Sequence, residues 1–221
     1  MGFVVAIDGP AGSGKGTITK IIAEKRNLVS IDTGAMYRCV ALNCIEEGID
    51  STDIAGIEKI LETIKIELKK IDGEQKVFLN GKDVSREIRE PRVDDVVAKY
   101  AAIKQIRDKV TPMQREMGKT QNIIMEGRDI GTVVFPNADV KIFLDCSIEE
   151  RANRRYKQNL EKGIQMTYEE VLENIKERNR LETERDIAPF VKPEDAITVD
   201  STNLSIDEVV EEVLKIIDEK L

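Results

Sequence analysis

The chain has 221 residues, of which 41% are hydrophobic and 34% are charged, and its formal net charge at pH 7 is −8. This length allows one sizeable α/β core with an appended lobe and is too short for two ordinary independent domains. The acidic balance argues against duplex nucleic acid as a partner, because binding to its phosphate backbone needs a basic surface.

The chain shows no sign of membrane attachment or export. Its apolar stretches fall far short of the roughly 20 residues that cross a bilayer, and no basic segment precedes the short apolar run at the N-terminus. We therefore expect a cytoplasmic protein. Cys39, Cys44 and Cys146 are odd in number and lack C-x-x-C spacing, which indicates reduced, mostly buried thiols and neither disulfides nor zinc.

The first predicted element is an apolar run, residues 3–7, that is typical of a buried strand. A glycine-rich turn follows it and leads into an amphipathic helical pattern at residues 17–25. Backbone N–H groups of such a turn converge on phosphate oxygens, and the helix dipole favours the anion. Lys15 would reach the outer phosphates. The predicted phosphate-binding residues are Gly9, Pro10, Ala11, Gly12, Ser13, Gly14, Lys15, Gly16 and Thr17.

The position after the lysine departs from the usual loop. Gly16 stands where Ser or Thr is common, and Thr17 follows one position later. Thr17 is therefore the candidate Mg²⁺ ligand, with phosphates and water as the main ligands of the metal.

Further strand-length apolar runs follow, with helical patterns between them. They lie at residues 28–31, 122–125, 140–144 and 196–199. This alternation predicts a doubly wound, five-stranded parallel sheet in a single α/β domain, residues 1–221. Ligands of such sheets bind beyond the carboxyl ends of the strands, and here an acid follows each run: Asp8, Asp32, Glu126, Asp145 and Asp200.

Between residues 64 and 84 the pattern changes to alternation of apolar and polar residues. Asp72-Gly73 and Asn80-Gly81 are typical turn pairs, so we predict a small antiparallel meander. Because the meander interrupts the α/β rhythm, we assign it to an inserted lobe.

Two arginines follow strand ends. Arg38 comes after the second run and Arg128 after the third. The planar fork of arginine suits phosphate better than the point charge of lysine. These placements, facing the Lys15 loop, indicate a second ligand that carries phosphate.

A highly charged helix is predicted at residues 168–184, and we expect it to continue to Arg185. Helical spacing then places Arg178, Glu182 and Arg185 on one face. For this helix taken alone, an exposed face stabilised by ion pairs is an equal alternative to a ligand site.

These motifs together resemble the bacterial cytidylate kinases, a family of nucleoside monophosphate kinases, and the match runs nearly end to end. The matching segments are residues 7–17, 32–38, 83–89, 127–136 and 175–178. The resemblance implies a P-loop kinase that transfers the γ-phosphoryl group of ATP, with Mg²⁺, to CMP or dCMP and releases ADP with CDP or dCDP. It also implies that residues 35–110 form the lobe that binds the nucleoside monophosphate.

The same resemblance assigns roles to individual residues. It implies that Lys15, Arg128 and Arg185 are catalytic. It implies CMP-binding roles for Thr33, Arg38, Arg107, Arg128, Asp129, Arg178, Glu182 and Arg185. Among these, Arg38, Arg128 and Arg185 would hold the phosphate. Arg107 and Asp129 would read cytosine, and Arg178 with Glu182 would hold the ribose.

Residues 151–165 resemble the lid that closes over ATP, with Arg154 and Arg155 as ATP ligands. Two positions depart from the family pattern. Ala98 stands where a serine often contacts the base, and Glu182 replaces a shorter aspartate. We expect a monomer whose partners are the nucleotides.

The implied reaction is a direct in-line attack that needs no covalent intermediate. The chain contains no histidine, which excludes histidine base catalysis. A nucleotide phosphate with a second pKa near ~6 is already largely dianionic at neutral pH, so a dedicated base is dispensable.

Two other functions stay open at this point. The phosphate loop alone does not identify the acceptor, so UMP or a non-nucleotide hydroxyl compound is the nearest alternative. A GTP-binding switch is the other, because residues 53–56 fit the D-x-x-G pattern. No strand precedes that segment, however, and the chain contains no N-K-x-D or T-K-x-D guanine motif.

Overall fold

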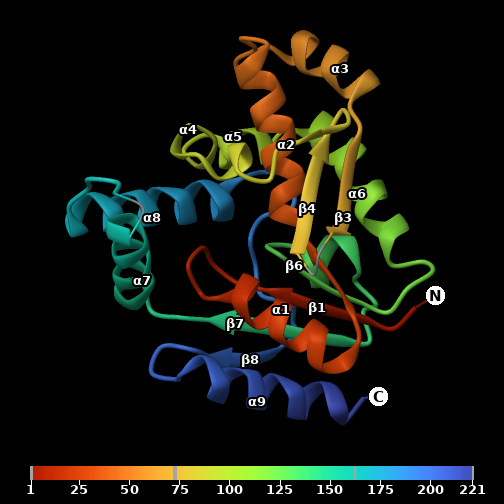
Figure 1. Cartoon of the computed structure of the whole chain (residues 1–221), viewed down its shortest axis with the longest axis vertical. Coiled ribbons are helices and arrows are strands. Elements are labelled where there is room, and N and C mark those ends of the chain that lie inside the picture. The colour runs from red at the N-terminus through yellow and green to blue at the C-terminus, as the bar shows by residue number, and fades with distance from the viewer. Residues whose placement is uncertain (1, 72–73, 162, 221) are drawn as a thin grey trace. The chain divides into compact units, whose positions relative to one another are not determined.

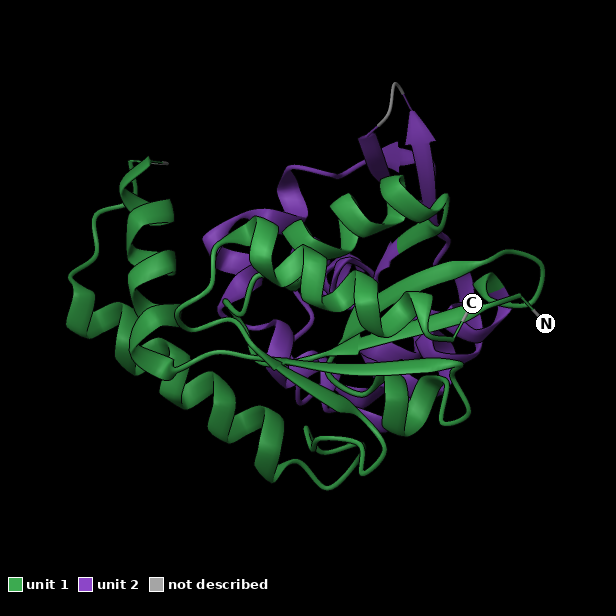
Figure 2. Ribbon diagram, turned by 90° about the horizontal axis from the view of Figure 1, so that it is seen from below, with its two compact units in different colours: residues 1–30, 117–221 green, residues 31–116 purple. Residues whose placement is uncertain are grey.

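The computed structural model describes residues 2–71, 74–161 and 163–220. The chain divides into two compact units (Figure 2): residues 1–30 with 117–221 form the first, and residues 31–116 form the second. The first unit is thus assembled from two parts of the chain that are far apart in the sequence.

A five-stranded sheet organises the first unit (Figure 1). Its strands, in order across the sheet, are β2 (Val29–Asp32), β6 (Ile123–Gly127), β1 (Val4–Asp8), β7 (Val140–Asp145) and β8 (Ile197–Asp200). β1 pairs in parallel with β6 and β7, and β7 pairs in parallel with β8. The predicted five-stranded α/β fold is therefore confirmed. The boundary between the two units falls within β2.

Two helices, α1 (Lys15–Arg26) and α9 (Ile206–Asp218), pack against strands of this sheet and against each other. Both helices carry apolar residues at helical spacing, and these side chains fill the space over the strands. The buried core of the first unit includes Val5, Ile7, Ile18, Ile22, Ile124, Ile142, Leu144, Val199, Val209, Val213 and Ile217. Every residue of β1 is buried, as expected for the central strand of a parallel sheet.

Helices α7 (Ile148–Glu161) and α8 (Tyr168–Glu184) also belong to the first unit and lie side by side (Figure 1). They enclose a small apolar cluster around Ala152, Val171 and Ile175. This helical pair carries the arginines of the predicted lid.

The expectation that the α8 helix continues to Arg185 is wrong. Glu184 is the last helical residue, and Arg185 has extended backbone angles (φ −66°, ψ 140°). Pro189 limits how far such a helix could continue, because proline lacks an N–H and its ring clashes with the carbonyl four residues earlier in a continuing helix. Arg185 is therefore the C-cap residue of α8, one position beyond its last helical residue.

The second unit combines helices with a small sheet. Its helical elements are α2 (Thr33–Glu46), α3 (Ile54–Thr63), the 3₁₀ turn η1 (Glu87–Arg89), α4 (Pro91–Asp94), α5 (Val97–Ala101) and α6 (Lys104–Met117). Its strands are β3 (Ile66–Ile71), β4 (Glu74–Leu79) and β5 (Lys82–Asp83), which pair antiparallel as predicted.

One predicted turn of this meander follows β4. Asn80 and Gly81 both have positive φ (51° and 86°) between β4 and β5, which is the geometry of a tight hairpin turn. The other predicted turn, Asp72-Gly73, lies outside the described residues.

All of the cysteines are free and buried, as expected. Burial raises the pKa of Cys39 to about 12 and that of Cys44 to about 11, so these thiols stay protonated at neutral pH. Within the part of the chain that the structure describes, no helix combines the length and apolar character that crossing a membrane requires.

Candidate active site

The glycine-rich loop joins the carboxyl end of β1 to the first turn of α1. Gly12 and Gly14 have positive φ (82° and 94°), a conformation that side chains rarely adopt. At Gly9 a Cβ would lie 2.2 Å from the carbonyl oxygen of Leu144. Glycine is thus required at these positions, and the resulting loop leads into a helix N-terminus, where anions bind.

The Lys15 ammonium lies inside this loop and is held by it. Nζ donates hydrogen bonds to the carbonyl oxygens of Gly9 and Pro10, each at 2.7 Å, and to Ser13 Oγ at 3.3 Å. Lys15 is only 6% exposed. The cation therefore lies within the loop whose residues the sequence assigns to phosphate binding.

Lys15 also interacts electrostatically with other charged groups of the first unit. Burial lowers its pKa to about 7, and the charge of Arg128 acts in the same direction, while the carboxylates of Glu126 and Glu182 oppose the shift. A buried cation with a perturbed pKa beside a second cation indicates a site for polyanions. Phosphate groups would relieve the repulsion between Lys15 and Arg128.

Two arginines of α7 donate hydrogen bonds to carbonyl oxygens of the glycine-rich loop. Arg151 is buried, and its Nη1 donates a hydrogen bond to the Ala11 carbonyl at 3.2 Å. Arg154 donates through Nη1 to the Ser13 carbonyl at 3.3 Å and through Nη2 to the Ser201 carbonyl at 2.7 Å. Both side chains thus connect α7 with the backbone of the phosphate-binding loop.

Glu182 forms the centre of a buried charge cluster in the first unit. Its carboxylate accepts a hydrogen bond from Arg128 Nε at 2.7 Å and another from Arg178 Nε at 3.0 Å. Burial would raise the pKa of Glu182, but the two guanidinium groups outweigh that effect and lower it to about 2. The Arg128 guanidinium also lies over the ring of Phe190, 5.9 Å from its centroid. Arg128 is therefore fixed from two sides.

We expect Glu182→Gln to destabilise the protein by about 2 to 3 kcal/mol at pH 7, because it leaves two guanidinium groups without their shared carboxylate. The pKa of Glu182 is lower in the folded protein than in the unfolded chain. Its ionisation therefore stabilises the fold above about pH 4.3, and this contribution is lost as the pH falls towards 2. Urea unfolding of both proteins between pH 7 and pH 3 measures the difference.

Glu184→Gln is the matched control, because Glu184 pairs with Arg180 on the exposed side of the same helix. Its effect should stay within about 0.5 kcal/mol. Equal effects of the two substitutions would contradict the central role of Glu182.

The other predicted residues of the first unit are also ordered by local contacts. Asp129 is 4% exposed and directly follows Arg128 beyond the end of β6. Arg185 Nε donates a hydrogen bond to the Ala188 carbonyl at 2.7 Å. The structure thus assigns Asp129 and Arg185 to the same unit as Lys15.

In the second unit, Arg38 lies close to the backbone of Gly34. A Cβ at Gly34 would lie 2.9 Å from Arg38 Nη1, so glycine allows the guanidinium to fold back over the start of α2. Arg38 Nη2 pairs with Asp94 Oδ1 at 2.6 Å, and Arg89 pairs with Asp32. A phosphate group bound by Arg38 would compete with Asp94 for the same guanidinium.

Arg107 is almost completely buried in the second unit, at 4% exposure. Its Nη1 donates a hydrogen bond to the Ala101 carbonyl at 3.0 Å, and its guanidinium lies over the Tyr37 ring, 5.3 Å from the centroid. These contacts hold a planar donor in one orientation, as base recognition requires. Ala98, at the position where the family often has serine, is buried as well.

The predicted residues thus divide between the units. Lys15, Arg128, Asp129, Arg178, Glu182 and Arg185 belong to the first unit, while Thr33, Arg38 and Arg107 belong to the second. Sequence reasoning assigned no role to Arg89, Tyr37 or Ser201. The quoted motifs contain the first two, but only the fold shows that Arg89 meets Asp32 and that Tyr37 faces Arg107.

The D-x-x-G segment has a structural explanation. Asp53 is the N-cap of α3, and its Oδ1 accepts a hydrogen bond from the Gly56 N–H at 2.9 Å. Helix capping accounts for an aspartate at this position. The segment therefore gives no support to a GTP-binding switch.

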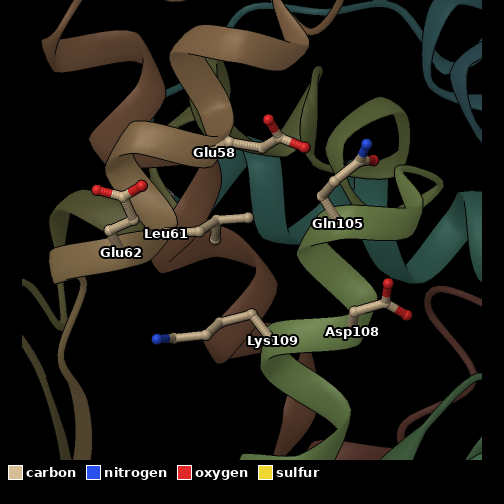
Figure 3. Close-up of a pocket in the computed structure, with 6 residues that line it drawn as sticks. All are labelled: Glu58, Leu61, Glu62, Gln105, Asp108 and Lys109. Atoms are coloured by element: carbon tan, nitrogen blue, oxygen red, sulfur yellow. The ribbon is translucent and has the colours of Figure 1, made fainter.

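A surface hollow of about 450 Å³ lies on the second unit, between α3 and α6 (Figure 3). Its lining residues are Glu58, Leu61, Glu62, Gln105, Asp108 and Lys109. The lining carries three carboxylates and one ammonium, so its charge does not suit a phosphate. None of the predicted site residues lines this hollow.

The solved structures that the chain resembles include a gluconokinase from Sinorhizobium meliloti 1021. The TM-score is 0.50 at 16% sequence identity, and the match covers 99% of this chain and 92% of the other. This likeness concerns the fold, an α/β kinase architecture.

Sequence comparison is more specific. The family model for cytidylate kinase matches residues 5–219. Curated relatives include the cytidylate kinase of Fusobacterium nucleatum subsp. nucleatum, 48% identical over 213 residues with 96% of both chains covered. The cytidylate kinase of Thermosipho melanesiensis is 48% identical, with 98% of this chain and 97% of the relative covered. The chain therefore belongs to the cytidylate kinase family, whose members are nucleoside monophosphate kinases with the P-loop kinase fold.

Proposed function

We propose that this protein transfers the γ-phosphoryl group of ATP to the phosphate of CMP or dCMP, and forms ADP with CDP or dCDP. The observation that carries this proposal is the charge arrangement of the first unit. There a buried Lys15 in a glycine loop interacts with Arg128, which Glu182 and Phe190 hold in place. Family membership supports the choice of a nucleoside monophosphate as acceptor.

The chemistry follows from these groups. Lys15 and the N–H groups of the loop would bind the outer phosphates of ATP, while Arg128 neutralises charge on the transferring group. The acceptor phosphate is largely dianionic at neutral pH and attacks in line, so no covalent intermediate forms. A lid formed by residues 151–165, of which residue 162 lies outside the described residues, would exclude water. We assign ATP contacts in it to Arg154 and Arg155.

The residues near the loop fit Mg²⁺. Thr17 is exposed in the first turn of α1, and a Cβ at Gly16 would lie 3.3 Å from Glu126 Oε1. Thr17 and Glu126 thus offer hard oxygen ligands beside the phosphate loop. Among the residues that the structure describes, no three His, Cys, Asp or Glu side chains form a metal-binding group. When bound, Mg²⁺ would neutralise charge on the ATP phosphates.

The predicted acceptor ligands belong to both units. We propose that residues 35–110 form the acceptor lobe, in which Arg38 holds the phosphate and Arg107 reads the base, with Thr33 beside them. From the first unit, Arg185 would hold the phosphate, Asp129 would read cytosine, and Arg178 with Glu182 would hold the ribose. We further propose a monomeric cytoplasmic enzyme.

ADP formation from ATP and Mg²⁺ with CMP, dCMP, UMP, AMP or GMP tests the function. We expect the highest kcat/KM with CMP or dCMP, because the Arg107 fork and the Asp129 carboxylate offer both donors and an acceptor to the cytosine edge. Acceptor-free ATP hydrolysis is the background. A higher rate with another acceptor would reject the cytosine specificity, and nucleotide binding without turnover would reject the kinase function.

A further inference from the structure

Asp8 is a buried carboxylate to which the sequence assigns no contact. It is the last residue of β1, directly before the phosphate-binding loop, and is only 1% exposed. Its Oδ1 accepts a hydrogen bond from the Ile130 N–H, and its Oδ2 accepts one from the Gly131 N–H, each at 2.7 Å. Both carboxylate oxygens are thus bound by a segment more than 120 residues away in the sequence.

The bound segment carries the predicted acceptor ligands. Ile130 and Gly131 begin the single π-helical turn η2 (Ile130–Val134), which directly follows Arg128 and Asp129. The first N–H groups of a helical turn lack partners within it. Asp8 supplies these partners from the neighbouring strand and so fixes the backbone that follows the two side chains.

The close approach of the two segments depends on Gly131. A Cβ at that position would lie 3.2 Å from Asp8 Oδ2 and 3.0 Å from Pro193 Cγ. Glycine therefore lets the backbone approach the carboxylate closely. The contact is built from both sides, by an acid on β1 and a glycine in η2.

The burial of this acid is unfavourable. Burial raises the pKa of Asp8 to about 6, while the backbone hydrogen bonds of Gly131 and Ile130 oppose this effect. Asp129 raises the pKa further, and Lys15 lowers it. A buried carboxylate that is weakened as an acid and adjoins the site is typical of a functional position.

We propose that Asp8 is a positioning residue, which holds the Arg128–Asp129 segment at a fixed place relative to the phosphate-binding loop through its two backbone hydrogen bonds. The inference rests on the proposed function, in which the loop binds the donor and Arg128 with Asp129 binds the acceptor. In-line transfer requires the two nucleotides at a defined separation, and a displacement of about 1 Å can reduce the rate about 10²-fold.

Asp8→Asn tests this role with little change of shape. The amide NH₂ would point a donor at one of the two backbone N–H groups, and that hydrogen bond would be lost. We expect kcat to fall by about 10²-fold and KM for CMP to rise, with KM for ATP within about twofold of wild type. Steady-state kinetics with each nucleotide varied in turn, together with thermal unfolding, measures these quantities.

Asp200→Asn is the matched control. Asp200 is also a strand-end acid, but it is exposed and accepts its hydrogen bonds from Thr202, two residues away. This variant should keep wild-type values of kcat and both KM constants. In Asp8→Asn, kcat could instead fall only in proportion to the folded fraction, with both KM constants unchanged. That result would show a purely structural role for Asp8 and would overturn the proposal.

Gly131→Ala perturbs the contact between Asp8 and Gly131 by changing Gly131. It tests the proposal even if Asp8→Asn fails to fold. It should also raise KM for CMP more than KM for ATP. Wild-type kinetic constants in Gly131→Ala or in folded Asp8→Asn would overturn the proposal. The assays use whichever acceptor the wild-type protein phosphorylates best. A wrong cytosine assignment would therefore appear in the wild-type protein and would not decide the role of Asp8.

Discussion

Lys15→Ala is expected to reduce CMP-dependent ADP formation by at least about 10³-fold, because it removes the buried cation beside which charge develops on the transferring phosphoryl group. Lys15 is held by three acceptors of its own loop and is nearly inaccessible to solvent. An external amine therefore cannot easily take its place. The measurement is the initial rate at saturating ATP, Mg²⁺ and CMP, compared with wild type.

Lys20→Ala is the control for this substitution, because Lys20 is an exposed lysine of the same helix. Its rate should equal that of wild type. A Lys15→Ala variant that binds ATP normally and keeps more than a tenth of the wild-type rate would contradict the assignment of Lys15.

The lowered pKa of Lys15 predicts a second measurable effect, the uptake of protons when ATP binds. Between pH 7 and pH 8 much of the Lys15 population is neutral, because its pKa is about 7. Phosphate oxygens favour the ammonium form, so ATP binding in this range should be accompanied by proton uptake. Calorimetry in buffers of different ionisation enthalpy detects such uptake, and it should be smaller in Lys15→Ala.

Arg128→Ala is expected to lower kcat/KM for CMP by about 10²- to 10³-fold. Arg128 interacts electrostatically with Lys15, and its Nε is fixed by Glu182. Truncation leaves Glu182 with Arg178 as its remaining arginine partner, so we expect some loss of stability but a folded protein. Circular dichroism and urea unfolding should show the folded state under assay conditions, while coupled detection of ADP shows the loss of transfer.

Two further arginine variants sharpen this test. Arg180→Ala removes an exposed arginine that pairs with Glu177 and Glu184 on α8, and it should leave transfer unchanged. Arg128→Lys keeps the charge but loses the planar fork, so it should recover only part of the rate. Unchanged turnover in Arg128→Ala would reject its role.

Much of the fold could be predicted from local sequence. The five apolar runs are strands because each is short, rich in β-branched residues and followed by a polar residue, and the first strand of the meander begins with alternating apolar and polar residues. The phosphate loop could be identified because its glycines serve a backbone conformation that few other residues adopt. In these segments the information lies within a few consecutive residues.

The end of α8 shows where such reasoning failed. The charged pattern continues through Arg185, and its spacing alone gave no reason for the helix to end. Pro189 excludes a helix that runs through residue 189, but it does not fix the end at Glu184. The proline signalled an end before residue 189, and the exact last residue required the structure.

The contacts around the site could not be predicted in the same way. Asp8 was recognised as a strand-end acid, but its partners are the backbone N–H groups of Ile130 and Gly131. Every residue except proline has a backbone N–H group, so the sequence does not show which of them Asp8 binds. The stacking of Arg107 on Tyr37 likewise depends on how α2 and α6 pack within the second unit. Side-chain identity predicted the candidates, whereas their partners required the fold.

The order of the strands in the sheet determines when β1 can pair during synthesis. β1 is made first, yet its two neighbours in the sheet, β6 and β7, begin at Ile123 and Val140. Until they are made, β1 lacks both of its neighbours in the sheet, and its pairing requires closure of a loop of more than 100 residues. The sheet of the first unit therefore forms only after β6 and β7 have been made, and a shorter ribosome-bound chain leaves the apolar residues of β1 unpaired.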